Sequence, residues 1–269
     1  VIGFGGFASG PSLMMATWLG IPTMIQEQNS YRGLTNRLLG KRVDKICTAY
    51  EEASKYFNSD AIQLIGNPVR KDLTKAVDRK EAVGHYGLKE GTKTVLLVGG
   101  SLGARTFNRA MKSLKNEVEE SGVQFIWQIG KLYNEEYGKC ETAKLTNVCA
   151  LPFLERMDMA YEAADLVVAR AGALTISELA LLGKATLLIP SPNVSEDHQT
   201  KNAMALVRKK SARIMKDDEC ELGLIKEIKK IIKEEKEMKM LSENIKKLAK
   251  ADATNEIAKV VLELVENRH

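Results

Sequence analysis

The sequence contains few aromatic residues, few cysteines and no long apolar run. Aromatic residues make up 6% of the 269 positions and do not alternate with basic residues, so no nucleic-acid partner is expected. The four cysteines form no C-x-x-C pair, which favours reduced structural thiols over a zinc site or a disulfide framework. No apolar run approaches the ~20 residues that cross a bilayer, so we expect any membrane contact to be peripheral.

The sequence also lacks an Asp-x-Asp or other metal-binding cluster, and we expect neither an essential protein-bound metal nor a cofactor. The net charge of +5 is small, and it is compatible with an acidic ligand or an anionic surface. The hydrophobic content of 44% is enough for two modest domains, each with its own core.

Short apolar runs alternate with helical patterns from Lys93 onward, which predicts a doubly wound parallel sheet. The runs are TVLLV, VQFIWQI, NVCAL, DLVVA, ATLLIP and ARIM. Asn67-Pro68 interrupts regular structure before this pattern begins, so we place a domain boundary there. The predicted units are residues 1–66, residues 67–252, and a C-terminal helix within 253–269 that packs back toward the first unit.

The stretch VVARAGALTISE, residues 167–178, passes from a buried strand through a turn of small residues into a helix. Such a helix start presents unpaired N–H groups, which attract anions such as phosphate. Glu178 would repel a phosphate, but its carboxylate can accept hydrogen bonds from ribose or sugar hydroxyls. The spacing of Thr175 and Glu178 also fits a capping box, in which the glutamate bonds its own helix start. Both interpretations stay open at this point.

A second turn of the same kind, GGSLGA, follows the run TVLLV. Its glycines permit close backbone approach, and the hydroxyl of Ser101 can donate to a phosphate oxygen. Two such turns predict one ligand-binding edge of the sheet. The spacing matches neither the G-x-G-x-x-G nor the G-x-x-x-x-G-K-[ST] loop, which disfavours a redox enzyme or a kinase.

The first residues, VIGFGG, are typical of a buried strand that enters a glycine turn, so we expect further sequence upstream of Val1. A helix over residues 11–19 and strands over 22–26 and near 45–49 are predicted next. Asn29 and Asn36 follow the first of these strands, where amides can bind sugar hydroxyls or an acetamido group. Turn formation and capping remain the alternative for both asparagines.

Read together and in this order, six motifs resemble the MurG family of bacterial peptidoglycan synthesis: GFGGFASGP, QEQNSYRGLTNRLL, GNPVR, GGSLGA, RAGALTISELALLGKATLLIP and EDHQTKNA. Members of that family are UDP-N-acetylglucosamine:undecaprenyl-pyrophosphoryl-muramoyl-pentapeptide N-acetylglucosaminyltransferases. The resemblance covers essentially the whole chain. It implies an α/β fold of the GT-B type with two Rossmann-like domains on parallel sheets, of which the N-terminal one is expected to be incomplete.

The resemblance places the donor nucleotide mainly in the C-terminal domain. It implies that Glu178 holds the ribose hydroxyls and that Ser101 and Arg70 hold the pyrophosphate, for which a guanidinium offers paired donors. The residues implied along the diphosphate and sugar are Ala173, Leu174, Thr175, Ile176 and Ser177.

Three further contacts with the donor follow from the same resemblance. The backbone of Leu154 is expected at the uracil edge, and Gln199 at a hydroxyl of the GlcNAc. Asn29 is expected to reach across the cleft to the sugar. The first of these contacts would select the base, and the other two would select the sugar.

The catalytic residue is the part of the site that this sequence identifies least directly. The family's first glycine-rich turn carries the histidine usually proposed as the general base, and we expect that turn upstream of Val1. Glu27 is the remaining candidate for a catalytic carboxylate, with a structural role as its alternative. Family members usually have histidine where this chain has Gln26, and His198 fits a donor-site neighbour better than a base. We therefore expect the stretch from Val1 onward to bind a nucleotide sugar without turnover.

The reaction implied is an inverting transfer of GlcNAc from UDP-GlcNAc to the C4 hydroxyl of the muramoyl sugar in undecaprenyl-linked lipid I, which gives lipid II. An enzyme for this reaction must deprotonate the acceptor and stabilise the departing diphosphate. The alternatives are a UDP-GlcNAc 2-epimerase on a similar scaffold, or a nucleotide-sugar-binding module without turnover.

A polyprenyl acceptor implies a peripheral enzyme on the cytoplasmic face of the bacterial inner membrane. Trp18, Lys41 and Arg42 are the candidate contacts with its anionic surface, because indole favours the headgroup region and cations favour anionic lipids. Core packing is the alternative for the other apolar residues of the helix that contains Trp18.

Overall fold

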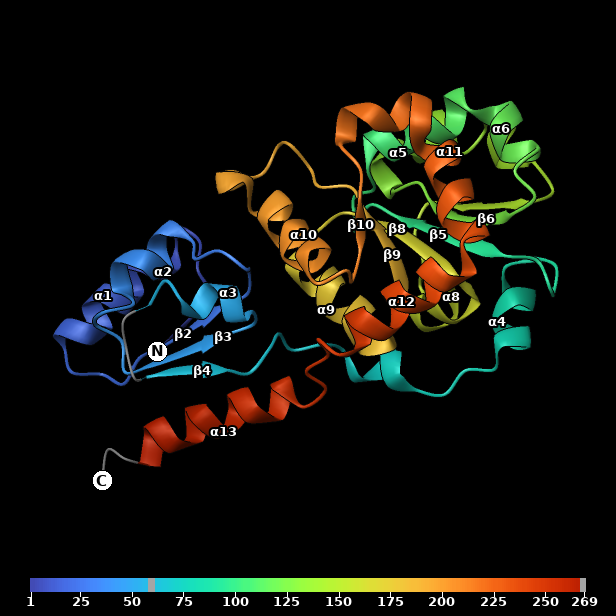
Figure 1. Cartoon of the computed structure of the whole chain (residues 1–269). Coiled ribbons are helices and arrows are strands. Elements are labelled where there is room, and N and C mark those ends of the chain that lie inside the picture. Colours follow the sequence, from blue (N-terminus) through green and yellow to red (C-terminus); the bar gives the residue numbers. More distant parts are fainter. Residues whose placement is uncertain (58–60, 267–269) are drawn as a thin grey trace.

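The computed structural model describes residues 1–57 and 61–266, and it contains two β-sheets surrounded by helices (Figure 1). The first sheet has the strand order β1-β2-β3-β4, and the second has the order β10-β9-β8-β5-β6-β7. All strand pairings in the described part of the chain are parallel. The predicted α/β fold with two Rossmann-like parallel sheets is confirmed.

The first sheet and its helices come from the N-terminal part of the chain. They are β1 (Ile2–Gly3), α1 (Ser9–Trp18), β2 (Met24–Glu27), α2 (Leu34–Leu39), β3 (Lys45–Thr48), α3 (Glu51–Ser54) and β4 (Ile62–Leu64). The core on one face of this sheet contains Leu13, Ile25 and Ile46, all fully buried. The helix predicted over residues 11–19 corresponds to α1, and the two predicted strands correspond to β2 and β3.

The second sheet carries most of the remaining elements. Its strands are β5 (Thr94–Val98), β6 (Gln124–Gln128), β7 (Val148–Leu151), β8 (Leu166–Ala169), β9 (Ala185–Leu188) and β10 (Arg213–Ile214). The remaining α-helices, of which all but α13 belong with this sheet, are α4 (Arg79–His85), α5 (Arg105–Ser113), α6 (Lys115–Glu119), α7 (Asn134–Tyr137), α8 (Met157–Ala163), α9 (Ala173–Leu182), α10 (His198–Arg208), α11 (Cys220–Lys233), α12 (Glu235–Lys246) and α13 (Ala253–Glu266). Short 3-10 turns are η1 (Lys71–Thr74), η2 (Lys131–Tyr133), η3 (Glu141–Lys144), η4 (Ser195–Asp197) and η5 (Asp217–Glu219). Among the described helices, none combines the length and apolarity that a bilayer span requires.

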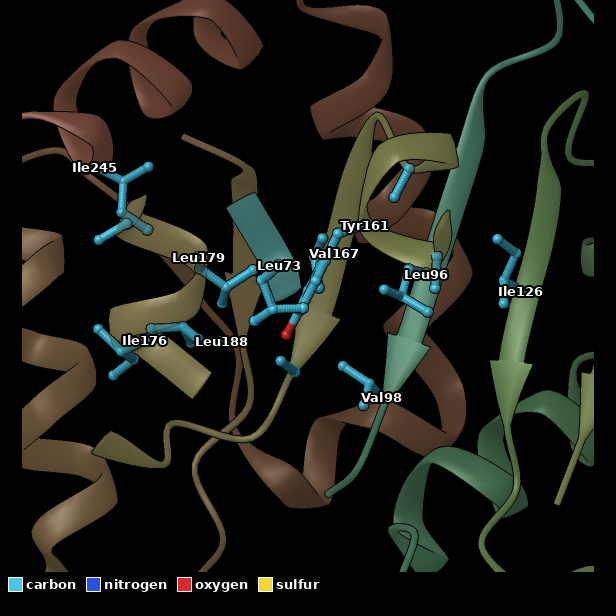
Figure 2. Packing of buried hydrophobic residues seen from close by; sticks show 14 of the residues in the cluster. Leu73, Leu96, Val98, Ile126, Tyr161, Val167, Ile176, Leu179, Leu188 and Ile245 are labelled. Carbon is cyan, nitrogen blue, oxygen red and sulfur yellow. The ribbon is translucent and has the colours of Figure 1, made fainter. Parts of the chain in front are cut away.

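The central strands of the second sheet are apolar on both faces because helices cover both. Along β5, Leu96 and Val98 point into one core, whereas Val95 and Leu97 point into the other. Figure 2 shows the first of these cores, in which Leu96 lies near Val167. Continuous apolar runs are the pattern expected for strands buried in this way.

The strand order of the second sheet reverses beside β5. The chain adds β6 and β7 on one side of β5 and then returns to place β8 on its other side. In the register, Val98 at the end of β5 is paired with Ala169 at the end of β8. The turns that follow these two strands therefore lie at one edge of the sheet, at the reversal where ligands of open α/β sheets usually bind.

The chain passes between the two sheets twice, and the two connections touch. The first runs through Gly66, whose φ is +104° and where an added Cβ would lie 2.4 Å from the Cβ of Lys250 in the second connection. After the second connection, α13 returns to the first sheet and packs Val260 against Met24 and Cys47. Figure 1 shows α13 beneath that sheet. Gly66 therefore combines a left-handed backbone with a close approach, and both need glycine.

Candidate active site

The helix start after β8 is formed by backbone geometry rather than by a side-chain cap. Gly172 is the N-cap of α9, with φ −69° and ψ 143°, and no side chain caps it. The first backbone hydrogen bond of α9 runs from the N–H of Ile176 to the carbonyl of Gly172 at 3.0 Å. The N–H groups of Ala173, Leu174 and Thr175 therefore lie ahead of the helical ladder, as an anion site requires.

The capping-box interpretation of Thr175 and Glu178 is wrong. Thr175 lies inside α9, three residues after the N-cap Gly172, so it cannot cap the helix. The carboxylate of Glu178 instead accepts a 2.9 Å hydrogen bond from the hydroxyl of Tyr161 on α8. Burial raises the pKa of Glu178, while the bond from Tyr161 and the positive charge of Arg70 oppose that rise. Glu178 is thus a half-buried acceptor whose other lone pairs can receive hydroxyl groups.

The turn after β5 also needs its glycines. Gly103 has φ +78°, and a Cβ there would lie 2.1 Å from the carbonyl oxygen of Ile129. Gly100 has φ +86°, and its carbonyl accepts a 2.9 Å hydrogen bond from the side chain of Gln128. Ser101 stands exposed at the tip of this turn. The chain thus presents a small hydroxyl residue beside the start of α9, where a diphosphate could contact both.

Arg170 and Arg70 near this edge differ in how strongly the fold engages them. Arg170, in the turn after β8, makes a 2.5 Å ion pair with Asp217 and stacks on the ring of Phe107, 4.8 Å from its centroid. Arg70 is exposed, and its 3.7 Å contact with exposed Asp72 is a weak surface pair. The fold therefore engages Arg170 strongly and leaves Arg70 exposed, and the assignment of the pyrophosphate to Arg70 stays a prediction.

Leu154 lies in the loop after β7, and Gln199 lies at the start of α10, which follows β9. The side chain of Leu154 is buried in the core, so only its backbone can face a base. Gln199, in the first turn of α10, accepts a 2.8 Å hydrogen bond from the N–H of Ser191 through Oε1. That bond fixes the amide and leaves its NH₂ group to donate to a sugar oxygen.

Two other residues of the predicted site have their polar groups engaged in the fold. Ile176 is 3% exposed in the core shown in Figure 2, and its N–H belongs to the helical ladder. Ser177 donates to the carbonyl of Ala173 at 3.0 Å and accepts from Asn67 at 3.1 Å. These contacts leave Ile176 no polar group for a ligand, and they make Ser177 part of the connection between the sheets.

Glu27 organises the loop that follows β2. Its Oε1 accepts from the N–H of Asn29 at 3.0 Å, and its Oε2 accepts from the N–H of Gly33 at 3.0 Å and from Nδ2 of Asn36 at 2.8 Å. Glu27 is 2% exposed. Both carboxylate oxygens are therefore occupied, which favours the structural alternative for Glu27 and also for Asn36.

Asn202 of α10 joins the two halves of the molecule. Its Oδ1 accepts a 2.8 Å hydrogen bond from the N–H of Ser30, and its Nδ2 donates to Oδ1 of Asn29 at 3.1 Å and to the carbonyl of Ala171 at 3.3 Å. Sequence reasoning did not single out this residue, although it lies within the EDHQTKNA motif. Its spacing of three from Gln199 places both on one helix face, which is the signal that could have found it.

No group of three or more histidine, cysteine, aspartate or glutamate residues is arranged to hold a metal ion in the part of the chain that the structure describes. The candidate site thus consists of backbone N–H groups, a carboxylate with its tyrosine, amides and an exposed guanidinium. Such a set suits a ligand that combines a diphosphate with several hydroxyl groups.

The C-terminal domain of glycosyltransferase family 28 matches residues 94–257, and the N-terminal domain of that family matches residues 1–48. The chain belongs to glycosyltransferase family 28. It is 47% identical, over 269 residues, to the UDP-N-acetylglucosamine--N-acetylmuramyl-(pentapeptide) pyrophosphoryl-undecaprenol N-acetylglucosamine transferase of Parabacteroides distasonis, covering 99% of this chain and 73% of that protein. The enzyme of that name from Flavobacterium psychrophilum is 46% identical, covering 100% of this chain and 73% of the relative. The predicted resemblance to the MurG family is confirmed.

Solved structures agree with the family 28 assignment. MurG of Acinetobacter baumannii is 29% identical, with a TM-score of 0.75 over 98% of this chain and 73% of that one. The UDP-GlcNAc 2-epimerase of Neisseria meningitidis, bound to UDP-GlcNAc, is 13% identical with a TM-score of 0.69, over 98% of this chain and 76% of that one. At 13% identity, the second likeness shows the fold alone. Membership of family 28 makes this chain a glycosyltransferase, and its two Rossmann-like domains form a GT-B fold.

Proposed function

We propose that this chain is an N-acetylglucosaminyltransferase that moves GlcNAc from UDP-GlcNAc to an undecaprenyl-linked muramyl-pentapeptide, and so makes lipid II. The observation that carries the proposal is the convergence of Glu178, Ser101 and the start of α9 on one edge of the second sheet. Its support from relatives is the 47% identity to a transferase named for that acceptor.

In this proposal, residues 67–252 bind the donor and residues 1–66 face the acceptor. Glu178 accepts from the ribose hydroxyls, and the N–H groups of Ala173, Leu174 and Thr175 meet the diphosphate. Ser101 and Arg70 add a hydroxyl and a permanent positive charge to the same diphosphate. These donors bind the diphosphate more strongly as UDP leaves, because breaking the glycosidic bond places additional negative charge on the diphosphate.

The sugar end of the donor lies between the two halves of the molecule. Gln199 presents its NH₂ group there, and Asn29 lies within hydrogen-bond reach of Asn202 at 3.1 Å. Glu27 takes a positioning role in place of the predicted catalytic role, because it holds the backbone of Asn29. The leaving diphosphate and the attacking C4 hydroxyl must lie on opposite faces of the GlcNAc, so the acceptor enters from the N-terminal half.

The enzyme is peripheral in this proposal, and one surface of the N-terminal half faces the membrane. We define the membrane-facing surface as Trp18, Leu19, Leu38, Lys41 and Arg42. Trp18 is 69% exposed, Leu19 65% and Leu38 63%, so these three large apolar side chains are open to contact with a membrane. Arg42 contacts Sδ of Met14 on α1 at 3.0 Å, so the basic residues lie beside the apolar ones. Indole and cations together suit an anionic headgroup region.

Product analysis tests the proposed function. With UDP-GlcNAc and a muramyl-pentapeptide pyrophosphoryl lipid, we expect the full-length enzyme to form the disaccharide lipid and release UDP. With UDP-GlcNAc alone, formation of UDP-ManNAc would instead support the epimerase, and binding without any product would support the non-catalytic module.

A further inference from the structure

A basic groove lies at the mouth of the cleft between the two halves, apart from the donor residues. It consists of a pocket of about 450 Å³ between α10 and the loop after β2, and a pocket of about 280 Å³ between α2 and α3. Lys55 and Tyr56 line both pockets, so the two pockets are neighbours. The cations of the basic groove are Arg32, Arg37, Lys41, Lys55, Lys201 and Arg208.

Aromatic rings form the wall of the basic groove. The rings of Tyr31 and Tyr56 meet edge to face, with their centroids 5.0 Å apart. Lys201 of α10 places its Nζ 3.6 Å from the centroid of Tyr31, which links the two halves of the molecule. The guanidinium of Arg32 lies 5.6 Å from the centroid of Tyr56 and donates to the carbonyl of the same residue. The wall is therefore ordered before any ligand arrives.

The positive charge of the basic groove is not neutralised by the fold. Within residues 1–57 and 61–266, none of its six cations makes a salt bridge. Lys201 donates at 2.8 Å to the backbone carbonyl of Glu196, a neutral partner. The acidic residue in the groove lining, Glu52, is paired with Lys209 at 3.2 Å. A concave surface with unpaired cations favours an anionic ligand.

The position of the basic groove connects it with the acceptor. Ser30 in its lining follows Asn29, and Lys201 follows Gln199 by two residues, so one end opens beside the sugar end of the donor site. At the other end, Lys41 is shared with the membrane-facing surface. A group attached to the acceptor sugar can therefore enter the basic groove while the lipid remains at the membrane.

We infer that the basic groove binds the peptide of the acceptor through its carboxylate groups. The inference rests on the proposed function, because it takes the acceptor to be the muramyl-pentapeptide lipid that the relatives' names give. A muramyl group is an acyl group, so it occupies the amino end of the peptide and leaves a free carboxylate at the far end. Cations pair with that carboxylate, and the rings of Tyr31 and Tyr56 pack on the chain between. The pyrophosphate of the acceptor is also anionic, but it is compact and has no apolar part that could pack on the aromatic wall.

The test combines a charge change in the enzyme with a change in the acceptor. In the full-length enzyme, Arg208→Gln with Lys55→Gln removes two exposed cations of the basic groove. We expect KM for the peptide-bearing acceptor to rise roughly 3- to 10-fold, while KM for UDP-GlcNAc stays the same. For the same lipid without its peptide, the wild type already has the higher KM, and the double variant changes it no further. Lys226→Gln with Lys230→Gln, on exposed positions of α11, is the matched control and leaves both values unchanged.

Each other outcome is informative. An equal rise for both acceptors would mean that the basic groove contacts the pyrophosphate, and it would overturn the inference. Unchanged KM for both acceptors would overturn it as well. Arg208→Lys keeps the positive charge, so we expect this variant to have the wild-type KM for the peptide-bearing acceptor. If the wild type transfers GlcNAc to neither acceptor, the proposed function itself fails, and this result is distinct from the others.

Discussion

The hydroxyl of Tyr161 donates a 2.9 Å hydrogen bond to Oε2 of Glu178 and so joins α8 to α9 at the donor edge. Tyr161 is 1% exposed, and burial raises the pKa of its hydroxyl well above the ordinary value. The phenol therefore stays protonated and acts as a fixed donor. It holds one oxygen of the Glu178 carboxylate, and the proposal assigns the remaining lone pairs to the ribose hydroxyls.

Glu178→Gln should weaken binding of UDP-GlcNAc. Replacing a charged acceptor of hydroxyl hydrogen bonds should cost about 1.5–3 kcal/mol, or roughly 10- to 150-fold in affinity. Isothermal titration calorimetry measures this directly. Glu117→Gln, at an exposed position of α6, is the control. Equal affinity of the Glu178 variant and this control would remove Glu178 from the donor site.

The same substitution should affect stability in a pH-dependent way. Burial raises the pKa of Glu178 in the folded protein, so its stabilising contribution is present in the protonated form and is lost as the pH rises through the folded pKa. Glutamine cannot ionise. The Tm of Glu178→Gln should therefore exceed that of the wild type near pH 7, and this difference should shrink toward about pH 4. A difference that grows on acidification would contradict the raised pKa.

Tyr161→Phe should have the opposite effect on the same carboxylate. The hydrogen bond from Tyr161 lowers the pKa of Glu178, so its loss makes ionised Glu178 costlier in the folded protein. We expect the Tm of this variant to fall more at neutral pH than at acidic pH, by thermal unfolding across that range. A loss of Tm that is independent of pH would indicate a packing defect alone.

Asn202→Ala should uncouple the two halves of the molecule. It leaves the N–H of Ser30 and Oδ1 of Asn29 without their partner, and such losses cost about 1–3 kcal/mol where the groups are buried. Urea denaturation would show the loss, and kcat should fall because Asn29 is no longer held. Asn116→Ala, at an exposed position of α6, is the control, and an equal effect of the two changes would argue against the link.

Lys41→Glu with Arg42→Glu should weaken binding to vesicles that contain anionic lipid. Each cation near such a surface contributes about 1 kcal/mol, so reversal of both should reduce binding by more than roughly 10-fold and spare UDP binding. Vesicle sedimentation at low and high salt measures this. Lys226→Glu with Lys230→Glu on α11 is the control. Vesicle binding that changes neither with the salt concentration nor with the double substitution would place the membrane contact elsewhere.

Sequence patterns were sufficient for the fold because the patterns are local. The run TVLLV corresponds to β5, residue for residue, since each of its four apolar side chains enters one of two cores. The Thr175 and Glu178 spacing left a capping box open as an alternative for the same reason: a capping box is a local pattern, whereas the start of α9 is fixed by the end of β8 and by Gly172. Local sequence patterns do not show which strands become neighbours in the sheet, and so which strand ends lie side by side.

The contacts that complete the site were beyond sequence reasoning because they join distant parts of the chain. Tyr161 meets Glu178 only because α8 and α9 pack on the same face of the sheet. Asn202 meets Ser30 across 172 positions, when the two halves come together. Glu27 could be singled out as a carboxylate after a strand, but its hydrogen bonds depend on how the loop folds around it.

The most direct measurement is a crystal structure of the protein with UDP-GlcNAc. We expect the ribose hydroxyls within hydrogen-bond distance of the Glu178 carboxylate, the diphosphate at the N–H groups of Ala173 to Thr175 beside Ser101, and the uracil edge at the backbone of Leu154. A nucleotide bound away from the turns after β5 and β8, with Glu178 still bonded to Tyr161 and free of the ligand, would contradict the proposed donor site.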